Sequence, residues 1–199
     1  MRKLHVKPLL FVAISVLAFS VMMNAAVKEK TELRANLTGL QEVAAATVIT
    51  DATGTFTATI NDDATITYTL TYKNLSSAVT QAHIHIGATK ISGNVSIFLC
   101  SNLGNGPAGT PACPDDATHS GSVSRTVSAV DVTNIAASQG VPAGDMKDAV
   151  RAIVSHVTYA NVHTANHPAG EIRGQIRSTE DEDDELPGAD SHHHDHHHD

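Results

Sequence analysis

Residues 53–70 read TGTFTATINDDATITYTL, and this stretch decides the fold. Its two arms alternate threonine with a mostly apolar residue, so each arm would present one polar and one apolar face as a strand. Asn61, Asp62 and Asp63 lie between the arms, and both residue types tolerate the left-handed backbone conformations of tight turns. The stretch therefore predicts a β-hairpin.

Similar short runs recur on both sides of the hairpin. They alternate or are rich in β-branched residues, and they span residues 32–37, 81–86, 94–99, 121–128, 158–163 and 171–177. Short strands separated by turn signals predict a sandwich or barrel. The chain has no Trp and only 4% aromatic residues, a composition that favours sandwich packing over a large aromatic pocket. We expect an all-β domain built as an antiparallel β-sandwich.

One short helix interrupts the β pattern. Its apolar stripe follows helical spacing at Met146, Ala149, Val150, Ile153 and Val154. Asp145 precedes the stripe and is a suitable N-cap. We expect this helix to pack over one end of the sandwich.

The two ends of the chain differ in composition from the middle. Residues 1–26 have a basic start, a long apolar run and small residues at 24–26, which predicts a signal peptide, with an uncleaved membrane anchor as the alternative. Residues 179–199 combine an acidic run with six histidines and predict a disordered tail. The folded domain is then residues 27–178. The protein would be periplasmic or extracellular, with no membrane contact after signal cleavage.

The tail is a candidate chelator of low specificity, through His192, His193, His194, His196, His197 and His198. The alternatives are a purification tag and an acidic solubilising tail without metal. The tail also dominates the formal net charge of −8, since 9 of the 21 acidic residues lie in residues 180–199. Residues 27–178 carry 10 Lys and Arg against 12 Asp and Glu. Without a basic stripe, nucleic-acid binding has no electrostatic support.

Cys100 and Cys113 are the two cysteines, and they bracket a loop rich in turn-forming residues. In an exported protein, an even pair at this spacing predicts a disulfide. A catalytic or metal-binding thiol is the poorer interpretation.

Two histidine motifs lie about 80 residues apart. His83 and His85 alternate with isoleucines in AHIHIG, so both imidazoles project from one face of a strand. His163 ends a second strand, and His167 lies before Pro168 in a turn that could return its ring to the strand end. Four converging histidines suit copper or zinc, and we expect them to meet at one end of the sandwich.

The same motifs carry a family resemblance. NVHTANHPAGEIRGQ at 161–175, LQEV at 40–43 and FLCSNLG at 98–104 together resemble the CHRD domain, a module named after chordin and common in secreted bacterial proteins. The resemblance covers residues 32–177. It implies an extracellular all-β domain with no established enzymatic role in bacteria. The His-x-His strand is also similar to that of Cu/Zn superoxide dismutase, so the Greek-key sandwich would be superoxide-dismutase-like or immunoglobulin-like.

Each candidate residue also has a structural interpretation. The histidines could be a hydrogen-bonded cluster that only holds loops in place. Glu171 and Arg173 could form a buried ion pair, although Glu171 could instead orient a ligand histidine from outside the coordination shell. His119 could be a fifth ligand or an exposed loop residue, and His156 follows a helix end, where a histidine needs no functional explanation.

Catalysis has little support in this sequence. No GxSxG motif, HExxH helix or Ser-His-Asp order is present, and no zinc subloop resembling that of superoxide dismutase is recognisable, so dismutation is a minor alternative. We therefore expect a metal-binding protein that holds copper or zinc, with the tail recruiting ions. The alternative is a non-catalytic structural, adhesion or protein-interaction module with an extracellular protein or matrix partner.

Overall fold

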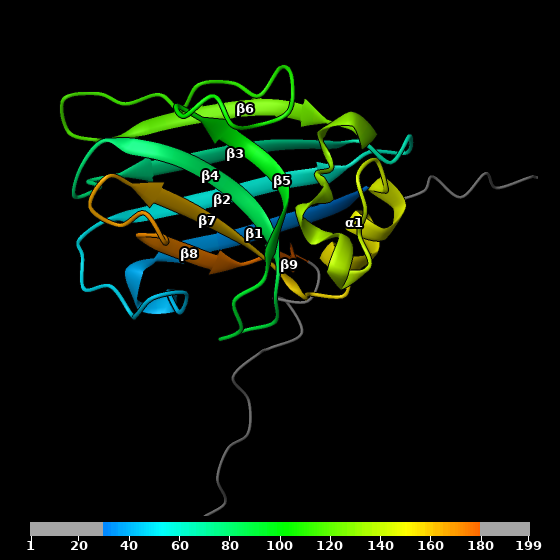
Figure 1. Cartoon of the computed structure of the whole chain (residues 1–199), viewed down its shortest axis with the longest axis horizontal. Coiled ribbons are helices and arrows are strands. Elements are labelled where there is room, and N and C mark those ends of the chain that lie inside the picture. The colour runs from blue at the N-terminus through cyan, green and yellow to red at the C-terminus, as the bar shows by residue number, and fades with distance from the viewer. Residues whose placement is uncertain (1–29, 180–199) are drawn as a thin grey trace, which may run out of the picture.

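The computed structural model describes residues 30–179, and its strands follow the sequence pattern closely (Figure 1). The strands are β1 (Thr31–Thr38), β2 (Thr53–Ile60), β3 (Ile66–Lys73), β4 (Val79–Ile86), β5 (Asn94–Ser101), β6 (Gly121–Val127), β7 (Thr158–Thr164), β8 (Ile172–Gln175) and β9 (Arg177–Ser178). The helices are α1 (Met146–Val154) and the 3-10 helices η1 (Gly39–Gln41), η2 (Ala129–Asp131) and η3 (Asn134–Gln139). The all-β fold with one short α-helix is confirmed. The expected signal peptide and residues 180–199 of the expected tail lie outside the described residues.

The strands of the described residues form one antiparallel sheet. Its order is β5-β4-β7-β8-β1-β2-β3-β6, and β9 also pairs with β1. Between β8 and β1 the pairing is limited to Arg173 and Thr38, and here the sheet bends so that β4, β5 and β7 cross over β1, β2 and β3 (Figure 1). A bridge between Ile97 and Val132 brings the far end of the sheet back toward the segment after β6. The sandwich is thus one continuous sheet that nearly closes on itself.

The predicted hairpin contributes the centre of the core. β2 and β3 pair in register from Thr53 opposite Lys73 to Ile60 opposite Ile66. On their buried face the rings of Phe56 and Tyr68 stack with centroids 6.1 Å apart. The Tyr68 hydroxyl donates a hydrogen bond to the Leu99 carbonyl of β5, across the sandwich. The polar end of this tyrosine therefore ties the two halves of the sheet together.

Strands in the two halves differ in how they are buried. β1 and β3 alternate buried residues with more exposed ones, as expected when one face meets solvent. By contrast, every residue of β7 is buried, and so is β4 from Ala82 to Ile86. The inward face of β4 and β7 belongs to the main core through Ile84 and Val162. Their opposite face is also covered, and it carries the histidines.

Helix α1 lies at one end of the sandwich, as predicted (Figure 1). The Asp145 side chain accepts a hydrogen bond from the Asp148 amide at 3.0 Å and caps the helix. Met146, Ala149 and Ile153 are buried, whereas Val154 is 45% exposed. The apolar stripe is therefore narrower than the spacing predicted, because the helix ends at Val154 and its last turn is open to solvent.

The predicted disulfide between Cys100 and Cys113 is present, and both residues are buried. It joins β5 to the far end of the following loop. Asn102 reinforces the link, since its side chain donates to the Cys113 carbonyl at 3.0 Å and accepts from the Cys113 amide at 2.9 Å. Within residues 30–179, no helix is long and apolar enough to span a membrane.

Candidate metal centre

Strands β4 and β7 bring three of the four predicted histidines together. His83 and His85 share the outer face of β4, and the antiparallel register places His163 of β7 opposite Gln81, two residues from His83. The pairing of β4 with β5 shifts register beside both β4 histidines. Such bulges re-aim side chains at functional sites.

The three rings form one compact cluster. Taking one ring nitrogen from each of His83, His85 and His163, the nitrogens all lie within 4.8 Å of one another. Nδ1 of His83 lies 3.2 Å from Nε2 of His163. The centroid of the His85 ring lies 5.4 Å from that of His83 and 6.0 Å from that of His163. This group is the one set of three potential metal ligands that the described part of the chain brings together.

Backbone carbonyls fix the orientation of two rings. Nδ1 of His85 lies 2.9 Å from the Gly93 carbonyl, and Nδ1 of His163 lies 3.0 Å from the Pro168 carbonyl. Because a carbonyl can only accept, each Nδ1 must carry the proton. Nε2 is then the lone-pair nitrogen of both rings. This is the way proteins prepare metal-binding histidines, by holding the outer ring nitrogen with an acceptor.

The same logic assigns the proton of His83. Since Nε2 of His163 is unprotonated, Nδ1 of His83 donates to it across the 3.2 Å contact. Nε2 of His83 and Nε2 of His85 are then lone-pair acceptors. Both atoms are buried and have no hydrogen-bond partner among the described residues. Buried polar atoms without partners are rare and mark places where an ion or water belongs.

Burial keeps the three imidazoles neutral. It is the largest cause that lowers the pKa of His83 to about 2, with smaller contributions from His163 and His85. It also lowers the pKa of His85 to about 4 and lowers that of His163. Neutral imidazole is the form that ligates metals, so the three rings have the protonation state that a metal site requires.

Aromatic and cationic groups surround the cluster. The Phe98 ring meets His83 edge-on with centroids 4.4 Å apart, and the Tyr159 ring stacks on His85 at 4.8 Å. The guanidinium of Arg173 lies 3.4 Å from the centroid of the Tyr159 ring. Arg173 also donates hydrogen bonds to the Ala88 and Ile91 carbonyls, at 3.1 and 3.0 Å. These contacts hold the loop after β4 against the sheet, and Gly93 closes that loop.

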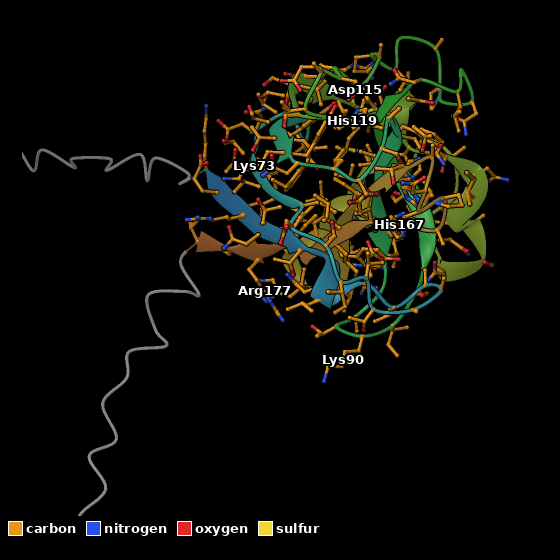
Figure 2. All side chains as sticks on the ribbon, turned by 90° about the vertical axis from the view of Figure 1, so that its left-hand side faces the viewer. Lys73, Lys90, Asp115, His119, His167 and Arg177 are labelled. Carbon is orange, nitrogen blue, oxygen red and sulfur yellow. A yellow bond between two sulfur atoms is a disulfide. The ribbon has the colours of Figure 1, made fainter. Side chains whose placement is uncertain are left out.

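His167 is not brought into the cluster. The turn does fold back, but through its backbone: the His167 carbonyl accepts from the amides of Thr164 and Gly170, at 3.3 and 3.0 Å. This arrangement presents the Pro168 carbonyl to His163. The side chain of His167 instead lines a hollow of about 380 Å³ between the turn and residues 45–49. Figure 2 shows His167 well apart from His119, which lies beside Asp115 with a ring nitrogen 3.1 Å from the carboxylate.

Glu171 does not orient a site histidine. Its carboxylate is fully buried and accepts four hydrogen bonds, from the Ser76 amide and hydroxyl and the Thr50 and Thr164 hydroxyls, at 2.8 to 3.0 Å. It also forms no ion pair with Arg173 among the described residues. The predicted Glu171–Arg173 pair is therefore wrong. Glu171 is a structural anchor that joins β7 to the segments around residues 50 and 76.

Glu42 was missed by the sequence interpretation. It is 2% exposed, and its carboxylate accepts a hydrogen bond from the Asn161 side chain. Burial raises its pKa to about 7, against the opposing effects of Arg173 and Asn161. Its one sequence signal is membership of the LQEV motif, because an acidic residue outside a strand is ordinarily exposed. The carbonyls of Gly93 and Pro168 carry no sequence signal at all.

The comparisons agree with this architecture. The model of the CHRD domain matches residues 33–176. No curated protein and no solved structure matches the chain. The match takes in β2 to β8, the disulfide, all three clustered histidines and Glu42, which is well over half of the 199 residues. The chain therefore belongs to the CHRD domain family.

Proposed function

We propose that this protein is an exported, non-catalytic metal-binding protein that holds one copper or zinc ion between His83, His85 and His163. The observation that carries the proposal is the pair of buried Nε2 atoms, on His83 and His85, without hydrogen-bond partners. Hydrogen bonds to carbonyls aim the rings of His85 and His163 with Nε2 free of a proton. Such a set of neutral imidazoles suits copper and zinc rather than calcium or magnesium, which require oxygen ligands.

The spacing of the rings supports binding with small adjustments. When two ring nitrogens each lie about 2.0 to 2.1 Å from the same ion, the distance between the two nitrogens is roughly 3.3 to 3.6 Å. One ring nitrogen from each of the three histidines already lies within 4.8 Å of the other two, so modest rotations of the rings would bring them to that spacing. His85 must move inward, and the hydrogen bond between His83 and His163 must be given up. Binding would therefore replace one hydrogen bond with three coordination bonds.

The rest of the chain fits the same proposal. A disulfide between Cys100 and Cys113 is suited to an oxidising compartment, and export would place the domain there. The six tail histidines would raise the local concentration of metal ions near the domain. The physiological partner in this account is the metal ion itself.

The test uses the mature chain with the six tail histidines replaced by serine, so that weak chelation by the tail is removed. Equilibrium dialysis against copper or zinc should find one tightly bound ion per chain. His85→Phe preserves the aromatic stack on Tyr159 but removes a ligand, and it should abolish tight binding. His119→Asn is the matched control, because His119 is an exposed loop histidine held by Asp115, and it should bind normally.

A second candidate function rests on the hydrogen bond between His83 and His163, which holds the cluster together without metal. In that account the domain is a structural or adhesion module that binds an extracellular protein or matrix partner. The same experiment separates the two candidates. No tight stoichiometric ion, or full binding by His85→Phe, would favour the structural module.

A further inference from the structure

We propose that the ion held by His83, His85 and His163 is monovalent copper, Cu(I), rather than a divalent ion. This inference rests on the proposed function and names the oxidation state that the site selects. It follows from three properties of the site: its charge, its number of ligands and its exclusion of water.

The site offers no negative charge to a bound cation. Its three ligands are neutral imidazoles, and no carboxylate belongs to the ligand group within the described residues. The nearby Glu42 carboxylate is engaged by Asn161, and Glu171 is saturated by Ser76, Thr50 and Thr164. The cost of burying an ion rises with the square of its charge, so a divalent ion costs about four times as much as a monovalent one. Buried neutral ligands therefore favour the lower charge.

A fixed positive charge strengthens this preference. The Arg173 guanidinium lies 3.4 Å from the centroid of the Tyr159 ring, and that ring stacks on His85 at 4.8 Å. Arg173 is 2% exposed, so solvent screens its charge poorly. It repels a divalent ion twice as strongly as a monovalent one. Glu42 offsets part of this charge, but it leaves the ligand cluster without a net anionic neighbour.

The ligand number points the same way. Zinc is almost always four-coordinate, and with three histidines it needs a water or a further donor. The carbonyls of Gly93 and Pro168 already accept hydrogen bonds from the ligand rings. The free Nε2 atoms of His83 and His85 are buried, and the Phe98 and Tyr159 rings pack against the two imidazoles. Cu(I) accepts three ligands in a plane and needs no water.

The experiment compares both ions on the mature chain whose six tail histidines are replaced by serine. Cu(I) is titrated without oxygen against the chromogenic chelator bicinchoninate, and Zn²⁺ is titrated against a zinc-binding dye. We expect one Cu(I) per chain, bound at least about 100-fold more tightly than Zn²⁺. His85→Phe should lose the Cu(I) site, and His119→Asn should keep it.

A charge variant tests the reason for the preference. Arg173→Gln removes the positive charge and retains a donor for the loop carbonyls, and circular dichroism would confirm that the variant is folded. It should tighten Zn²⁺ binding relative to Cu(I) by roughly fivefold. An unchanged ratio of the two affinities would contradict the charge argument. Arg173→Lys keeps the positive charge and provides the matched control. Once circular dichroism has shown that it is folded, its ratio of Zn²⁺ to Cu(I) affinity should equal that of the unsubstituted protein.

The outcomes distinguish the inference from the proposed function. If Zn²⁺ binds as tightly as Cu(I) and both require His85, the preference for Cu(I) is overturned and metal binding stands. If neither ion binds with one-to-one stoichiometry, both proposals fall.

Discussion

Single atoms determine how the histidine cluster is held. The Pro168 carbonyl reaches His163 because the turn after β7 closes at Gly170, whose φ is +127°. A Cβ at this position would lie 2.6 Å from the Asn161 side-chain nitrogen and 2.7 Å from Glu42 Oε1. Glycine is therefore required here for both its backbone conformation and the space above it.

Gly170→Ala should consequently destabilise the domain by roughly 2 to 4 kcal/mol, since strain and displacement of Glu42 and Asn161 add together. Urea unfolding of the metal-free protein would measure the loss. Gly104→Ala is the matched control: Gly104 also has positive φ, at +64°, but a Cβ there would meet nothing within 4 Å. The control should lose about 1 kcal/mol. Equal losses in the two variants would show that the space around Glu42 does not matter.

The protonation of the cluster predicts how stability depends on pH. Unfolded histidines titrate near pH 6.5, whereas burial lowers the pKa of His85 to about 4 and that of His83 to about 2. Below pH 6.5 the unfolded chain binds protons that the folded chain refuses, so stability falls as the pH falls. Each buried histidine contributes up to about 1.4 kcal/mol per pH unit. Burial raises the pKa of Glu42 from 4.5 to about 7, so this group makes the folded protein more stable as the pH falls through that range. Its effect is smaller than the combined effect of the three histidines.

Urea unfolding in the presence of a chelator should therefore show a steep loss of stability of the metal-free protein between pH 6.5 and pH 4.5. His85→Phe should have a slope roughly half as steep, because two histidines instead of three then act against the opposing effect of Glu42. A flat profile over this range, or the same slope in the variant, would mean that the rings do not stay neutral in the folded protein.

At the scale of elements, the hairpin strands were predictable from the sequence because their residues alternate between an apolar and a polar face. The hairpin at 53–70 ends within three residues of its predicted bounds, and β4 does place His83 and His85 on one face. The position of that face was not predictable. The cluster lies on the outer face of β4 and β7, where the Gly93 and Pro168 carbonyls of two neighbouring loops contact His85 and His163.

His167 shows why a local pattern was insufficient. The spacing suggested that its ring could return to the strand, but the turn satisfies its backbone first, through Thr164 and Gly170. Glu171 was misassigned for a related reason. Its carboxylate accepts hydrogen bonds from Ser76, which is 95 residues away in the chain, from Thr50, which is 121 residues away, and from Thr164. No pattern in a single sequence reveals such distant contacts.

The disulfide belongs to the same scale, because it ties β5 to its following loop. Thiol titration of the denatured, unreduced protein should find no free thiol. Reduction should lower the free energy of unfolding by about 3 kcal/mol, the value expected for cysteines separated by 13 positions in the chain. Two reactive thiols per chain in the unreduced protein would contradict the bond.

At the scale of the whole molecule, the composition predicts different roles for the two parts of the chain: the domain binds one ion tightly, and the tail binds ions weakly. Replacing all six tail histidines by serine should leave the thermal midpoint of the metal-free protein unchanged, since a segment of this composition is expected to contribute no apolar side chains to a core. It should also reduce the number of weakly bound divalent ions seen by calorimetry. Replacing the six tail aspartates and glutamates at 180–185 by serine and glutamine is the matched control for charge. A clear drop in the midpoint after the histidine replacement would mean that the tail packs on the domain.

The central claim is that His83, His85 and His163 share one metal ion. Anomalous diffraction at the copper and zinc absorption edges, from metal-loaded crystals of the chain with its tail histidines replaced, tests this directly. We predict one anomalous peak between β4 and β7, with a nitrogen of each of the three rings about 2.0 to 2.1 Å away. An anomalous map without a peak there, or an ion held by other residues while the three rings keep their hydrogen-bonded arrangement, would contradict the claim.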